Sequence, residues 1–361
     1  MKACKNILAV LCLAFLTTAG CQSELFIDYQ EYRQQTEADT IDFVGGFIDK
    51  PINTRSTSLL ADHTASMGVW GWQTTSDNEK VQLFDNQAVV YSNATNEWTY
   101  SPKKFWSNDS YYNFYAYAPH SGSTAATVTI DQTTGRFNID GITLEGSNIM
   151  YNTPSRTTSG IFKETTDIDW MVDRTGLAGA KSLFGKQVTF NMQHILAKLN
   201  VKVRISSFLE ADANTVTLDS LIIGTFVGYG SFEQKLDHTP DPENETDNAA
   251  QEWTIDTTRP RYSINGAKNI EIDAAGYYVI ESLLIPQNVG AGNTVKITYT
   301  MTSGSQTEKF TSIFDLDKMF DRFTSGNNYT LIITIAPDII TFDAGSSRWD
   351  EQTVTTNRVL N

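Results

Sequence analysis

Four histidines are the first residues of this 361-residue chain to consider for metal binding or acid–base chemistry. They lie far apart, and none has a second histidine or a carboxylate at a metal-ligand spacing: His63, His120, His194 and His238. His194 begins an apolar run, so we interpret it as a hydrogen-bonding residue of a core or an interface. No GxSxG element occurs to position a nucleophilic serine. The sequence therefore predicts no enzymatic activity, no metal site and no cofactor.

An acidic segment over residues 237–247 carries several oxygen side chains of the kind that calcium prefers. The segment lacks the mid-loop glycine and the ligand spacing of a dedicated calcium loop. We interpret it as a solvated hairpin loop, and calcium binding stays open as the alternative.

A group of tryptophans and tyrosines runs from Trp98 to Tyr117. Exposed aromatic rings could stack on sugars, as could Trp253 further along the chain. The residues from Tyr111 to Ala118 alternate as in a strand with one face inward, which favours packing in a core.

The N-terminus has the features of an export signal. Lys2 and Lys5 form a positively charged start, an apolar run extends from Ile7 to Leu16, and small residues precede Cys21. The run is too short to span a membrane. Ala-Gly directly before a cysteine is similar to a bacterial lipobox, in which Cys21 is diacylated and becomes the first residue of the mature chain. The alternative is an ordinary cleaved signal with an incidental cysteine.

The cysteine count and the net charge narrow the classes of structure and of partner that remain. Cys4 and Cys12 would leave with residues 1–20, so the mature chain would keep a single cysteine and could form no internal disulfide. The net charge is −15, with 42 acidic and 27 basic residues, which argues against nucleic acid as a partner.

The rest of the chain predicts an all-β fold. After a polar tether over residues 21–39, short alternating runs are separated by Gly, Asn, Asp and Ser clusters, without the alternating helices of a parallel α/β fold. The length favours two antiparallel β-sandwich domains in tandem, over residues 40–180 and 181–361, with a seam in the small-residue segment 175–180. Ser312 to Phe323 is the best candidate for a helix, and an irregular loop is the alternative. The expected strands cover residues 41–47, 67–72, 87–91, 111–117, 126–130, 186–190, 197–205, 215–223, 277–285, 294–301 and 328–335.

One segment is familiar. Residues 188–203 contain the pattern Phe-x-x-x-His-x-Leu-Ala-Lys-Leu-x-Val, formed by Phe190, His194, Leu196, Ala197, Lys198, Leu199 and Val201. This pattern resembles a strand of the fimbrillin family, the type V pilus subunits of Bacteroidales. Shorter segments in the same order also resemble that family: Ile41–Phe43, Asn53–Ser56, Gly68–Trp72, Tyr112–Pro119, Leu283–Gln287, Ser325–Tyr329 and Ile340–Phe342 with Trp349.

The resemblance implies a lipidated pilin precursor with two transthyretin-like β-sandwiches. It would travel through the periplasm to the outer membrane and stand on the cell surface as part of a fimbria. In this family an Arg-specific protease removes the first strand, and a strand from another pilin subunit fills the open groove. The implied partners are thus other pilins, the protease, the outer membrane through the lipid anchor, and a glycan or protein receptor.

Carried onto this sequence, the resemblance makes Arg55 the candidate cleavage site, because the residues before it are polar and turn-like. Arg33 is the rival site, although cutting there would leave residues 41–47 attached. The removable strand would place Ile41 and Phe43 inward, and Phe47 with them. Residues 339–342 and the tail from 352 to 360 are both candidates for the donor strand.

The sequence leaves the position of the chain in a fibre open between shaft, anchor and tip. A monomeric surface lipoprotein that binds glycans or host ligands is the alternative function. That alternative would gain if Trp98, Trp106 and Trp253 were exposed and coplanar.

Overall fold

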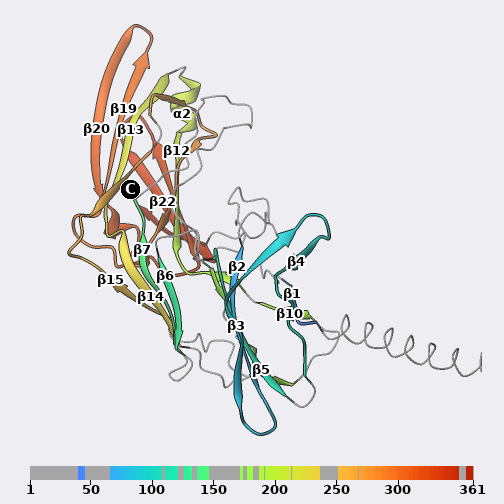
Figure 1. Ribbon diagram of the computed structural model, residues 1–361. Coiled ribbons are helices and arrows are strands. Elements are labelled where there is room, and N and C mark those ends of the chain that lie inside the picture. The colour runs from blue at the N-terminus through green and yellow to red at the C-terminus, as the bar shows by residue number, and fades with distance from the viewer. Residues whose placement is uncertain are drawn as a thin grey trace, which may run out of the picture.

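The computed structural model describes residues 40–44, 66–107, 110–120, 126–131, 136–145, 171–173, 177–181, 187–190, 192–212, 214–235, 251–266, 268–348 and 355–360. The chain is all-β, as the sequence predicts, and the described strands form five sheets that are mostly antiparallel (Figure 1). One short helix is described, α2 (Ser207–Ala211), with a 3-10 turn, η2 (Leu316–Lys318). The fold therefore rests on sheet packing.

Two sheets of the C-terminal half face each other and enclose the largest core. The first has the strand order β18-β12-β21-β22-β23, and the second has the order β16-β13-β19-β20 with β17 beside β13. Alternation explains the packing, since Leu199, Val201 and Val203 of β12 are fully buried and the residues between them are only half-buried. The strands are β12 (Ala197–Ile205), β13 (Thr215–Phe226), β16 (Tyr262–Asn265), β17 (Ile270–Ile272), β18 (Tyr277–Leu284), β19 (Thr294–Ser303), β20 (Gln306–Asp315), β21 (Asn327–Ile335), β22 (Ile340–Arg348) and β23 (Thr355–Leu360).

Long ladders hold these two sheets. β12 pairs with β21 in parallel from Lys198 to Ile205, and β19 pairs with β20 along ten residues each. The β19–β20 hairpin turns at Gly304, whose φ of 58° suits the first position of a two-residue loop. Lys198 of β12 forms a buried ion pair with Glu281 of β18.

The N-terminal half is built on one sheet that is covered on both faces. Its order is β11-β8-β5-β2-β3-β4, with β9 beside β5. Alternation in β5 sends Tyr112 and Phe114 into a first core and Tyr115 and Tyr117 into a second. Its strands are β2 (Met67–Thr74), β3 (Lys80–Ser92), β4 (Glu97–Thr99), β5 (Tyr111–Ala118), β8 (Met171–Asp173), β9 (Leu177–Lys181) and β11 (Met192–His194).

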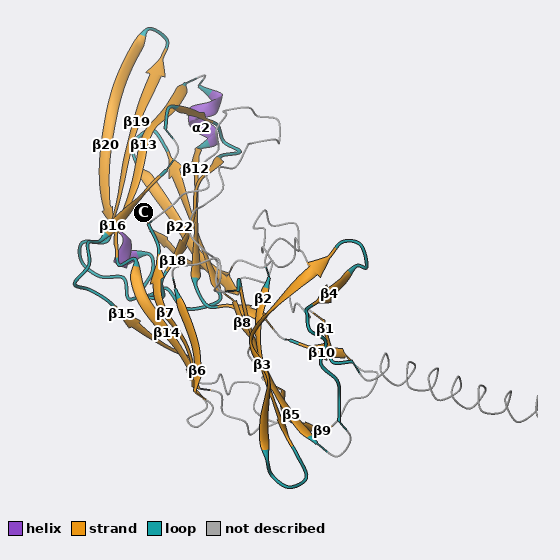
Figure 2. Cartoon of the chain, viewed as in Figure 1, coloured by secondary structure: helices purple, strands orange, loops and turns teal. Residues whose placement is uncertain are grey.

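The first core lies against a two-stranded sheet, β1 (Asp42–Val44) with β10 (Gln187–Thr189). The second core lies against a four-stranded sheet of order β15-β14-β7-β6. That sheet combines β6 (Thr127–Asp131) and β7 (Arg136–Thr143) with β14 (Tyr229–Lys235) and β15 (Gln251–Ile255). Figure 2 shows it next to β2, β3 and β5 and below the C-terminal sheets. It therefore unites strands from both halves of the chain.

The tandem-domain boundary stays a prediction. Residues 177–181, which overlap the small-residue segment that we expected to form the seam, make strand β9 and pair with β5. Val188, Phe190 and Met192 also belong to the first core, although they follow residue 180. The N-terminal core thus draws on residues to both sides of the expected boundary.

The helix that we expected from Ser312 to Phe323 is wrong. Residues 312–315 end strand β20, and the 3-10 turn over Leu316–Lys318 follows. Phe310, Ser312 and Phe314 alternate with more exposed neighbours, so a strand period competes with the helical spacing of the apolar residues. Leu316, Phe320 and Phe323 are still buried in the C-terminal core, from an irregular segment.

Candidate functional site: the first strand in its groove

Strand β1 is attached to the first core by a short ladder. Its three residues pair in parallel with β10, from Asp42 opposite Gln187 to Val44 opposite Thr189. Just before the strand, the Ile41 amide donates to the Lys104 carbonyl at 2.9 Å, and Thr40 forms an isolated bridge with Phe105. Short parallel pairing gives little backbone stabilisation, so side chains must hold β1 in place.

Two side chains provide that anchor. Ile41 has no exposed surface and Phe43 is 2% exposed. The Phe43 ring lies in an aromatic cage, 5.3 Å from Phe84, 5.4 Å from Tyr100, 5.5 Å from Phe190 and 5.9 Å from Phe114, measured between ring centroids. Burial of the two side chains contributes roughly 3–6 kcal/mol in total.

Tyr100 couples this cage to the backbone of the first strand. Its hydroxyl donates to the Ile41 carbonyl at 2.6 Å and accepts from the Lys104 amide at 3.2 Å. Burial raises the pKa of Tyr100 to about 12; the Lys104 backbone bond opposes this rise, and the Asp42 carboxylate adds to it. The hydroxyl therefore keeps its proton, and its role as donor, across the physiological pH range.

Charge contributes little to the attachment. Lys103 Nζ lies 3.4 Å from Asp42 Oδ1, but both side chains are well exposed. The same ammonium group lies 4.9 Å from the Tyr100 ring centroid. Exposed pairs of this kind contribute about 0–1 kcal/mol. Strand β1, together with the preceding Ile41, is thus a plug with two apolar anchors, a three-residue ladder and hydrogen bonds from the Ile41 backbone to Lys104 and Tyr100.

The segment that carries the fimbrillin pattern passes from this groove into the C-terminal sandwich. Phe190 is in the Phe43 cage, Leu196 is in the second core, and Ala197, Leu199 and Val201 are in the C-terminal core. His194 is 5% exposed at the end of β11. All seven pattern residues, Lys198 included, are buried, and together they connect the three cores.

Several predicted site residues lie outside the described residues: Cys21, Arg33, Phe47, Arg55 and the acidic segment 237–247. The candidate donor segments are partly described. Residues 340–342 begin β22, which lies between β21 and β23, and residues 355–360 form β23 at the edge of that sheet.

The tryptophans do not form an exposed platform. Trp98 is 7% exposed and Trp106 is 4% exposed, both in the first core, and Trp253 is half-buried in another sheet. Our condition for favouring the glycan-binding alternative is therefore not met. Among the described residues, no group of three metal-ligating side chains is arranged to hold an ion. No described helix is long and apolar enough to cross a membrane.

Sequence reasoning missed the role of Tyr100. We counted it among aromatic residues of a core or a sugar platform, but its contact with Ile41 joins positions 59 residues apart. No local spacing signals such a contact. The Tyr100 position within an aromatic-rich segment was the only available indication that it lies in the core.

The fold and the buried position of β1 define an all-β protein whose first core is completed by a short strand. The chain belongs to the fimbrillin-like family, whose model matches residues 54–349. That membership confirms the resemblance found in the sequence. It supports a fimbrial or adhesive role at the cell surface and a structural rather than an enzymatic function. The matched region begins after β1.

One solved structure shows the same fold, and a second is reported with it as a similar chain. A fimbrial protein from Bacteroides vulgatus ATCC 8482 is 18% identical, with a TM-score of 0.53 over 86% of this chain and 99% of that chain. A proposed cell adhesion protein from Bacteroides uniformis ATCC 8492 is 16% identical, with a TM-score of 0.47 over 86% of this chain and 98% of that chain. A search of the curated proteins gives no match.

Proposed function

We propose that this chain is a subunit of a cell-surface fimbria that assembles by strand exchange. Export as a lipoprotein through Cys21 brings the precursor by way of the periplasm to the outer membrane. Cleavage after Arg55 by an Arg-specific protease then separates β1 from the rest of the chain. A strand from another pilin subunit fills the groove that β1 leaves.

The observation that carries this proposal is the unequal attachment of β1. Its side chains fill an apolar cage, while its backbone pairs along only three residues. Emptying the cage would expose the rings of Phe84, Phe114 and Phe190, so an unfilled groove is unstable and favours a replacement strand.

Cleavage explains how β1 can leave. In the intact chain β1 is tethered, so its local concentration at the groove is high. After the cut, a separate peptide must bind with the roughly 3–6 kcal/mol of its two anchors, less the cost of association. The dissociation constant of such a peptide is roughly tens of micromolar to millimolar, or weaker, so dilution releases the peptide. A longer donor strand with more apolar anchors would replace it stably.

The test uses the purified chain that begins at Gln22, with an Arg-specific protease. We expect a new N-terminus at Ser56 and a ladder of oligomers on a denaturing gel of unheated samples. Arg55→Lys keeps the charge but removes the cleavage site, so that variant should stay monomeric. Arg33→Lys is the matched control and should polymerise normally. Polymers from the Arg55→Lys variant, or an uncut chain, would contradict the proposal.

The lipid anchor has its own test. Cys21→Ala should abolish acylation and membrane attachment of the full chain in the producing bacterium. Metabolic labelling with a fatty acid analogue measures this directly. Labelling that persists in the Cys21→Ala variant would remove the anchor from the proposal and leave the strand-exchange step unaffected.

A further inference from the structure

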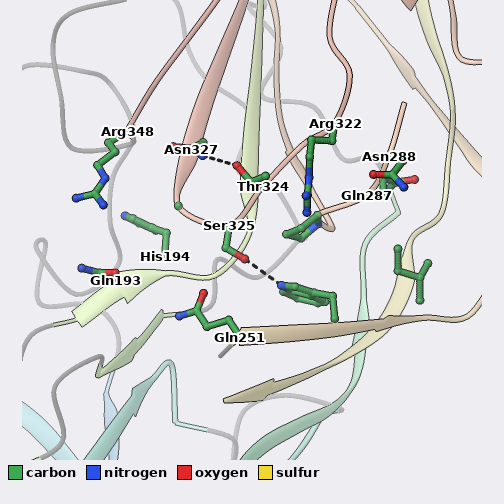
Figure 3. Close-up of a pocket in the computed structure, with 14 residues that line it drawn as sticks. Gln193, His194, Gln251, Gln287, Asn288, Arg322, Thr324, Ser325, Asn327 and Arg348 are labelled. Carbon is green, nitrogen blue, oxygen red and sulfur yellow. Dashed lines mark hydrogen bonds between the residues drawn. The ribbon is translucent and has the colours of Figure 1, made fainter. Parts of the chain in front are cut away.

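A cavity of about 620 Å³ opens where the C-terminal sandwich meets the four-stranded sheet. Figure 3 shows its lining residues, which come from β11, β15, the segment after β18, the segment that leads into β21, and the end of β22. Asn288, Arg322 and Arg348 at this cavity are exposed, whereas His194 and Gln287 are buried. The cavity therefore has a solvent-accessible rim and a closed floor.

The charge of this cavity is opposite to that of the protein. The chain carries a net charge of −15, yet no aspartate or glutamate is among the described residues that line the cavity. Two of the lining residues are arginines, Arg322 and Arg348. Neither guanidinium forms an ion pair with a carboxylate among the described residues. Both remain available to an anionic ligand.

One wall of the cavity is aromatic and fixed. Alternation in β15 turns Gln251, Trp253 and Ile255 toward the cavity and turns Glu252 away from it. The Trp253 indole Nε1 donates to Ser325 Oγ at 3.0 Å, and Phe232 packs against the ring with 5.4 Å between centroids. The half-buried indole is thus held in one orientation before any ligand arrives.

The adjoining wall is a polar loop that is also held in place. Thr324 accepts a hydrogen bond from Asn327, and its backbone amide donates to the Tyr329 hydroxyl at 3.0 Å. Gly326 turns the loop with a φ of 67°, and its amide donates to the Leu196 carbonyl at 2.9 Å. At the floor, the side-chain oxygen of Gln287 accepts from the Val227 backbone N–H, and its side-chain nitrogen donates to the Val227 carbonyl. Preorganised groups of this kind lower the cost of ligand binding.

We propose that this cavity binds a sugar that carries a carboxylate, such as a uronic acid residue of a surface polysaccharide. Arg322 would pair with the carboxylate, because a guanidinium matches the geometry of that group. Arg348 lies at the opposite side of the cavity in Figure 3 and would add a weaker, longer-range attraction. Trp253 would stack against the apolar face of the sugar ring, and the amide and hydroxyl side chains would bond to its hydroxyls. The cavity is large enough for a sugar of one or two rings. The cavity shares no residue with the β1 cage, so ligand binding can be tested separately from strand exchange.

The probes are D-galacturonate and D-galactose, which differ only in a carboxylate or a hydroxymethyl group at C6. Binding to the chain that begins at Gln22 is followed by saturation-transfer NMR and by the indole N–H signal of Trp253, assigned with a Trp253→Phe variant. We expect galacturonate to bind at least about tenfold more tightly than galactose, and binding to weaken as salt rises.

The variants test the geometry. Arg322→Gln should weaken galacturonate binding by about tenfold and leave the weak binding of galactose unchanged. Arg348→Gln should weaken galacturonate binding by a smaller factor, because Arg348 lies at the opposite side of the cavity (Figure 3). Both arginines are exposed, so these variants should fold normally, and circular dichroism checks this. Arg261→Gln is the control, because Arg261 is exposed and does not line the cavity. Trp253→Leu should weaken both sugars.

Three outcomes would overturn the proposal: equal binding of the two sugars, galacturonate binding that both arginine variants retain, or tighter binding of a glutamate-rich peptide than of galacturonate at the same sites. Because the Arg55→Lys variant should bind galacturonate like the native chain, failure of the sugar site and failure of the assembly proposal are separately visible.

Discussion

The C-terminal core and the first core of the N-terminal half are closed in different ways. The C-terminal core is enclosed by long ladders, of which the parallel β12–β21 ladder extends from Lys198 to Ile205. The N-terminal core is rich in aromatic rings and is closed at β1 by a ladder of three residues. Removing one strand from the C-terminal sandwich would break many backbone hydrogen bonds, whereas removing β1 would break few and expose mainly side chains.

This difference determines which strands are costly to remove and which strand another strand could replace. A β-strand that is held by its backbone ladder is costly to remove, because each buried N–H and C=O must find a new partner. A strand that is held by two apolar anchors can be replaced by any strand that offers similar anchors. We propose that the molecule combines a durable sandwich with a core whose first strand, β1, is replaceable, and each prediction below tests one side of that contrast.

The largest expected effect is in the durable core. Val201→Asp places an unpaired carboxylate at a position with no exposed surface and should cost at least about 4 kcal/mol of unfolding free energy. Soluble yield and urea unfolding followed by circular dichroism measure this. Lys296→Asp, at an exposed position of β19, is the control and should fold. An unchanged unfolding curve for Val201→Asp would contradict the assignment of the inner face.

Phe43→Ala should have the next largest effect, but a local one. Losing the ring from its aromatic cage should cost about 3–5 kcal/mol in the N-terminal core and leave the C-terminal sandwich intact. Hydrogen exchange should show faster exchange around Phe84 and Phe114 and no change in β12 and β21. Equal losses in both cores would show that they unfold as one unit.

Tyr100→Phe removes the hydrogen bond that the Tyr100 hydroxyl donates to the Ile41 carbonyl, just before β1. The variant should lose about 1 kcal/mol, because the buried Ile41 carbonyl loses its donor. In the native chain the folded pKa of about 12 is above the ordinary value of 10.0, so this stabilisation is complete below pH 10 and is lost as the pH rises toward 12. Tyr100→Phe should reduce that alkaline loss. An identical pH profile would remove Tyr100 from the plug.

The smallest effect is expected for the exposed pair. Lys103→Ala should change the stability of the N-terminal core by less than about 1 kcal/mol, and salt should mask the change. Thermal unfolding at low and high salt measures it. A loss as large as that of Phe43→Ala would mean that charge, not apolar burial, holds β1.

The sequence predicted the elements better than their partners. Alternation in β12 and in β21 identified both strands and the inward side chains Leu199 and Val201. Nothing in either strand showed that they pair in parallel, because the pairing joins segments more than 100 residues apart. The β7–β14 pairing between the two halves was missed because neither Arg136–Thr143 nor Tyr229–Lys235 was among the expected strands.

The candidate site was predictable only in part. The resemblance placed Ile41 and Phe43 on a first strand, and both side chains are buried. The cage residues Phe84 and Tyr100 come from other elements, so only the folded chain brings them together. The apolar spacing from Leu316 to Phe323 misled us because an irregular segment can bury the same residues as a helix.

The central claim is that β1 is a replaceable plug, and hydrogen exchange after cleavage tests it most directly. The chain is cut at Arg55, separated from its released peptide and compared with the uncut chain. The account predicts that protection around Phe84, Phe114 and Phe190 is lost on release and returns when a synthetic peptide of residues 40–47 is added in excess, while a peptide with alanine at positions 41 and 43 has no effect. A cut chain that keeps its peptide and its protection after dilution would contradict the account.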